Sequence, residues 1–61
     1  MTLEEAILKL TIAYEQAVLV HNSKVYQASI QIGHPDLATD LGDVQHYLTS
    51  AIERLKELQN E

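Results

Sequence analysis

The chain has 61 residues, 46% of them hydrophobic, and carries four Lys and Arg against nine Asp and Glu, a formal net charge of −5. This apolar content is too high for a disordered segment, yet a chain of this length buries only about 60% of the surface that its unfolded form exposes. Because there is no cysteine, disulfides and thiolate metal sites are excluded. We therefore expect one domain, residues 1–61, whose marginal core is supplemented by self-association.

The basic residues are few and dispersed along the chain. Clustered positive charge is what attracts nucleic acids and anionic membranes, so neither is an expected partner. The N-terminal residues include carboxylates where a secretory signal carries positive charge. The longest apolar run, Ala17 to Val20, is also far shorter than the roughly 20 residues of a membrane-spanning helix. These features predict a soluble, cytoplasmic protein.

The first predicted element is a helix over residues 3–32. Thr2 and Glu5 have the spacing of a capping box at its start. Gly33 follows its end as a left-handed cap, and Pro35 fits the first turn of the next helix. The positions of these few residues therefore divide the chain into two helices.

Part of the first helix has an alternative reading. Val25 to Ile32 alternates with the period of a strand, so helix and strand both remain open there. A break near Asn22 and Ser23 is the expected departure from one continuous helix. His21 falls on a core position, where we expect a hydrogen-bonded histidine rather than a metal ligand.

The second predicted helix spans residues 35–59 and has a regular apolar seam. Its members alternate spacings of four and three, as in a coiled coil. They are Leu37, Leu41, Val44, Leu48, Ala51, Leu55 and Leu58. The sequence therefore predicts an all-α fold, an antiparallel two-helix hairpin.

A second apolar stripe on the first helix remains uncovered in a lone hairpin. Two hairpins packed as a dimeric four-helix bundle would cover it, and twofold dimers are the commonest oligomers. Gly42 joins this interface because a glycine inside a helix is typical of a close helix crossing. The predicted interface residues are Leu8, Ile12, Leu19, Tyr26, Ile30 and Gly42.

An acidic stripe follows the second helix. Asp36, Asp40, Asp43 and Tyr47 are spaced four, three and four residues apart, so they share one face. We expect this face to be solvated and to be the place where a partner protein binds. In an alternative interpretation, Asp40, Asp43 and His46 bind a metal ion, because a carboxylate and a histidine one turn apart can share one.

The stretch "LGDVQHYL" with the preceding Asp40 resembles the MazG-like nucleoside triphosphate pyrophosphohydrolases, which are all-α enzymes. Their magnesium-binding helix has the pattern E-x-x-D, onto whose positions Asp40 and Asp43 fall. Matching neighbours are Leu41, Gly42, Val44, Tyr47 and Leu48. The resemblance implies a metal-dependent nucleotide hydrolase or nucleotide-binding module. It covers about ten residues, and the family's second carboxylate pair, E-x-x-E on a preceding helix, has no counterpart.

The preferred functional hypothesis is a small acidic helical interaction module, acting as a homo-oligomer in the role of adaptor, regulator or inhibitor. Its partners are a second copy of itself and another protein, and no cofactor or catalytic residue is predicted. The MazG-like hydrolase is the alternative. A third hypothesis, an RNA-binding hairpin dimer of the Rop type, matches the length but not the scattered basic residues.

Overall fold

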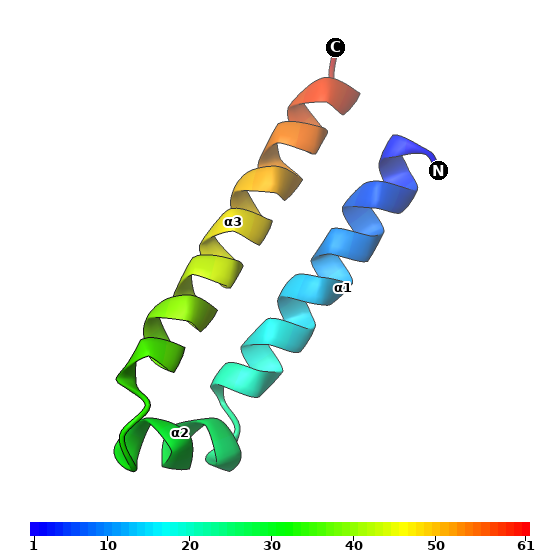
Figure 1. The fold of residues 1–61 in the computed structure, drawn as a ribbon. Coiled ribbons are helices and arrows are strands. Elements are labelled where there is room, and N and C mark those ends of the chain that lie inside the picture. Colours follow the sequence, from blue (N-terminus) through cyan, green and yellow to red (C-terminus); the bar gives the residue numbers. More distant parts are fainter.

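The computed structural model describes residues 1–61, apart from the side chain of Pro35, and contains three helices. These are α1 (Leu3–His21), α2 (Lys24–Gln31) and α3 (Pro35–Gln59). α1 and α3 run antiparallel side by side, and α2 crosses the end at which they are connected (Figure 1). The predicted all-α class is confirmed. The strand alternative is wrong, because the segment in question forms α2.

The predicted N-terminal helix is in fact two helices, and Ser23 is the residue that divides them. Its hydroxyl donates a hydrogen bond to the Val20 carbonyl at 2.7 Å and accepts one from the Tyr26 backbone N–H at 3.1 Å. Gln27 Nε2 donates to the His21 carbonyl at 3.0 Å, which satisfies a carbonyl left free at the end of α1. The expected break near Asn22 and Ser23 is therefore confirmed, and the single continuous helix is wrong.

The other helix ends follow the sequence signals. Thr2 Oγ1 accepts a hydrogen bond from the Glu5 backbone N–H at 3.1 Å, so Thr2 caps α1. Gly33 follows the C-cap of α2 with a φ of +115°, a conformation that side chains disfavour. Pro35 is the first residue of α3, where its missing N–H removes no helical hydrogen bond.

The three helices form an elongated, narrow molecule. The chain measures 47 × 15 × 15 Å, with a Cα radius of gyration of 14.2 Å against about 10.5 Å for a compact domain of this length. Its accessible surface is 4763 Å², whereas a compact monomer of this mass exposes roughly 4,000 Å². Among the side chains that the structure describes, only Tyr26 is buried, at 4% exposure. None of the described helices combines the length and the apolar character needed to cross a membrane.

The two glycines give opposite predictions when each is replaced by alanine. Gly33→Ala forces a side chain into a positive-φ conformation and should lower the free energy of unfolding by about 1–2 kcal/mol. Gly42 lies inside α3 with no atom within 4 Å of the place that an added methyl group would occupy, so Gly42→Ala should raise it by about 1 kcal/mol. Urea unfolding followed by circular dichroism measures both. Equal effects of the two substitutions would contradict this assignment.

Candidate functional site

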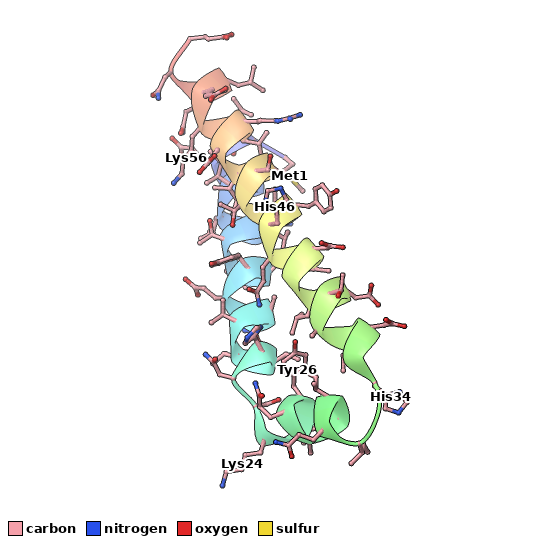
Figure 2. The ribbon with its side chains drawn as sticks, turned by 90° about the vertical axis from the view of Figure 1, so that its left-hand side faces the viewer. Met1, Lys24, Tyr26, His34, His46 and Lys56 are labelled. Carbon is pink, nitrogen blue, oxygen red and sulfur yellow. The ribbon has the colours of Figure 1, made fainter. Side chains whose placement is uncertain are left out.

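A polar cluster lies between α1 and α3 and shows their register. Gln45 Nε2 lies 3.5 Å from the Ala17 carbonyl oxygen and 3.4 Å from His21 Nδ1. The His21 ring in turn packs against the ring of Tyr26, with centroids 5.1 Å apart. Tyr26 lies at the corner where α2 meets the rest of the chain (Figure 2). The expected hydrogen-bonded His21 is confirmed. Gln45 was missed because a polar residue interrupts the apolar pattern used to find the core.

The regular seam of α3 is split between two directions. Leu41, Leu48 and Leu55 are half-buried, as are Gln45 and Ile52 between them, and this is the face that meets α1. Among the alternate members of the seam, by contrast, Ala51 is half-buried and the other three are exposed to solvent. They are Leu37, Val44 and Leu58. The seam is therefore a wider apolar face than one neighbouring helix covers.

The residues predicted for the dimer interface do not form one surface of the chain. Leu8, Ile12 and Leu19 are exposed on α1, away from the half-buried positions that meet α3. Tyr26 is inside the chain, Ile30 is half-buried on α2, and Gly42 is exposed on α3 with no other helix near it. Within the chain, only the three α1 residues form a continuous stripe. We call them the outer stripe.

The predicted acidic stripe lies on the surface of α3. Asp36, Asp40, Asp43 and Tyr47 are all exposed. The Tyr47 ring meets the neighbouring His46 ring edge-on, with centroids 5.3 Å apart. Asp36 and Asp40 also border a shallow hollow at the α2–α3 turn, together with Ser29 and His34. These side chains form a solvated negative surface.

The residues that the magnesium interpretation requires do not come together. Among the described side chains, no three His, Cys, Asp or Glu groups lie close enough to hold one metal ion. α2 carries no acidic residue, and Glu4, Glu5 and Glu15 of α1 are exposed. Because magnesium takes several oxygen ligands in near-octahedral geometry, Asp40 and Asp43 alone do not fit the site that the MazG resemblance implies.

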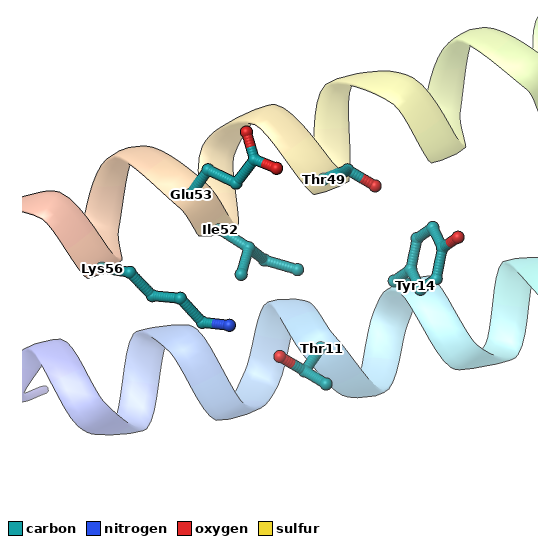
Figure 3. Close-up of a pocket in the computed structure, with 6 residues that line it drawn as sticks. All are labelled: Thr11, Tyr14, Thr49, Ile52, Glu53 and Lys56. Carbon is teal, nitrogen blue, oxygen red and sulfur yellow. The ribbon is translucent and has the colours of Figure 1, made fainter.

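A shallow groove follows one side of the contact between α1 and α3. Thr11 and Tyr14 line it from α1, and four residues line it from α3 (Figure 3). These are Thr49, Ile52, Glu53 and Lys56. Hydroxyl and charged groups therefore border this side of the helix pair. We call it the polar side.

No family model matches this sequence, and comparisons with curated proteins and with solved structures likewise return no match.

Replacing Tyr26 should separate the contribution of its ring from that of its hydroxyl. Tyr26→Ala empties the buried corner between α1, α2 and α3 and should cost roughly 3 kcal/mol, most of the stability of so small a chain. Tyr26→Phe keeps the ring and should change stability by less than about 0.5 kcal/mol. Thermal unfolding measures both. A large loss in Tyr26→Phe would show that the hydroxyl, rather than packing, holds the corner.

The metal interpretation has a direct test by ligand-induced stabilisation. A ligand that binds the native state raises the melting temperature. Because Asp40 and Asp43 lack further ligands, millimolar magnesium or manganese with a nucleoside triphosphate should leave the melting temperature unchanged. Asp43→Asn should behave like the unmodified chain in this assay. A rise that Asp43→Asn abolishes would support the hydrolase interpretation instead.

Proposed function

We propose that this chain is a small acidic protein-interaction module that acts as a homo-oligomer, in the role of adaptor, regulator or inhibitor. Its assembled form is a dimer of helical hairpins, a four-helix bundle. The observation that carries the proposal is the near absence of an interior. A single described side chain is buried, while apolar side chains remain exposed along both long helices.

The exposed apolar side chains are numerous and large for a chain of this size. On α1 they include Leu8, Leu19 and Val20, and on α3 Val44 and Leu58. Single exposed apolar residues are ordinary, but contiguous apolar surface on a small protein is typical of a binding surface. Burying it against another chain would supply the hydrophobic stabilisation that the thin helical layer lacks.

The acidic stripe provides a second surface, for a partner protein of another kind. Asp36, Asp40 and Asp43 project from one side of α3 and are exposed to solvent. A negative surface favours a partner with a basic surface and accelerates their encounter. A cytoplasmic location belongs to the same proposal, since the chain has no cysteine and needs no oxidising compartment.

Self-association predicts that stability depends on protein concentration. For a dimer that unfolds to monomers, a tenfold increase in concentration adds about 1.4 kcal/mol to the free energy of unfolding. The melting temperature should therefore rise by several degrees between about 5 and about 500 μM. Sedimentation equilibrium should give a dimer over the same range. A folded monomer whose melting temperature is independent of concentration would contradict the proposal.

A further inference from the structure

The polar side of the helix pair provides a reference for the direction in which other residues of α1 and α3 point. Thr11 marks the flank of α1 that borders the groove, and Thr49 and Lys56 mark the flank of α3 on the same side. The opposite flanks of the two helices must therefore also lie together, on the other broad side of the chain. This other side holds the feature that the sequence pattern did not reveal.

On that side, each long helix presents apolar residues at intervals of seven. Residues seven apart are separated by two helical turns and point in nearly the same direction. They are Ala6, Ala13 and Val20 on α1, and Val44, Ala51 and Leu58 on α3. Val20 and Leu58 are each 52% exposed, and Val44 is 47% exposed. We call these six residues the apolar face.

The register contact brings the two rows level with each other. Gln45 reaches both Ala17 and His21, so Gln45 lies level with the turn between them. Counting outward from this contact in antiparallel helices pairs Val44 with Val20, and the next rungs pair Ala51 with Ala13 and Leu58 with Ala6. The six residues of the apolar face therefore form three rungs across the two long helices, and none of the six is charged.

We infer that the apolar face is the surface through which two copies of this chain associate. This inference rests on the proposed function and specifies its interface. On α3, Gln45 and Ile52 face α1, and Val44 and Ala51, each one residue earlier, are turned by about 100° from them. A helix with apolar residues in two adjacent directions is a helix with two neighbours, as in a four-helix bundle.

The size of this side fits a second copy. Each long side of the molecule measures 47 by 15 Å, or roughly 700 Å², close to the roughly 800 Å² per partner of a stable interface. The outer stripe, by contrast, consists of residues of one helix, because Leu8, Ile12 and Leu19 all belong to α1. A second copy seated on the apolar face contacts both long helices, which a copy on the outer stripe does not.

Charge complementarity selects one arrangement of the two copies. Asp40 and Arg54 lie seven residues before and seven residues after Tyr47, at the edge of the apolar face. Asp40 and Tyr47 of the acidic stripe thereby belong to the interface between copies, which leaves Asp36 and Asp43 for a partner of another kind. If the two α3 helices cross antiparallel at Tyr47, each Asp40 lies level with the partner's Arg54. The twofold axis then passes beside Tyr47, and the α2 turns lie at opposite ends of the bundle. The proposed dimer contains this ion pair twice.

Two adjacent residues of α1 provide a matched test. Val20 belongs to the apolar face and Leu19 to the outer stripe, and both are at least half exposed in the chain. Val20→Glu should raise the dimer dissociation constant at least a hundredfold, because it places two charges in the interface. Leu19→Glu carries the same charge and should change the constant by less than threefold. Sedimentation equilibrium measures both variants at matched concentrations.

The outcomes separate this inference from the proposed function. A monomeric unmodified chain overturns both. A dimer that Leu19→Glu dissociates and Val20→Glu leaves intact overturns the choice of face alone, as does a dimer that neither variant weakens. Exchanging the charges tests the arrangement, since Arg54→Asp should weaken the dimer several-fold and Asp40→Arg in the same chain should restore it.

Cross-linking gives an answer even if Val20→Glu fails to fold. The chain has no cysteine, so one introduced cysteine reports one position. In Tyr47→Cys the two thiols meet across the twofold axis, and mild oxidation should yield a covalent dimer within minutes. Leu19→Cys, on the outer stripe, should remain mostly uncoupled under the same conditions. Faster coupling at position 19 than at position 47 would overturn the inference.

Discussion

Two long antiparallel helices form a layer one helix thick, and this geometry governs the rest of the molecule. A residue that packs against the opposite helix still has solvent beside it, which is why Leu41, Leu48 and Leu55 are only half-buried. The one place where three helices meet is the corner closed by α2, and there Tyr26 is buried. The interior of this chain is therefore confined to one end, and the remaining apolar surface is available for association.

The sequence predicted the helix class and most of the helix ends, because those depend on local chemistry. Thr2, Gly33 and Pro35 act within a turn of their own position, and each performs the expected role. The main prediction was one continuous helix over residues 3–32, and a break near Ser23 was only the expected alternative to it. Its cause is also local, since one hydroxyl accepts from Tyr26 N–H and donates to the Val20 carbonyl, but serine alone is a weak signal among so many apolar neighbours.

For the acidic stripe, the sequence predicts the exposed position of the residues but does not decide whether they bind a metal ion. Spacing along α3 correctly places Asp36, Asp40 and Asp43 on an exposed surface. A metal site also needs ligands from another helix, and their positions depend on how helices pair rather than on the pattern within one of them. α1 presents apolar and hydroxyl-bearing residues to α3, so the acidic residues of α3 meet no matching carboxylates among the side chains that the structure describes.

The seam of α3 explains why the pairing itself was harder to predict than the helices. A heptad pattern measures how wide the apolar face of a helix is, and it does not say which neighbour covers each half. In the structure Gln45 faces α1, with Nε2 3.5 Å from the Ala17 carbonyl oxygen and 3.4 Å from His21 Nδ1, and the preceding Val44 points away from α1. If α3 were rotated about its own axis so that Val44 faced α1, Val44 would be buried and Gln45 would be exposed. The rotation of α3 about its own axis thus decides which of its apolar residues α1 leaves uncovered.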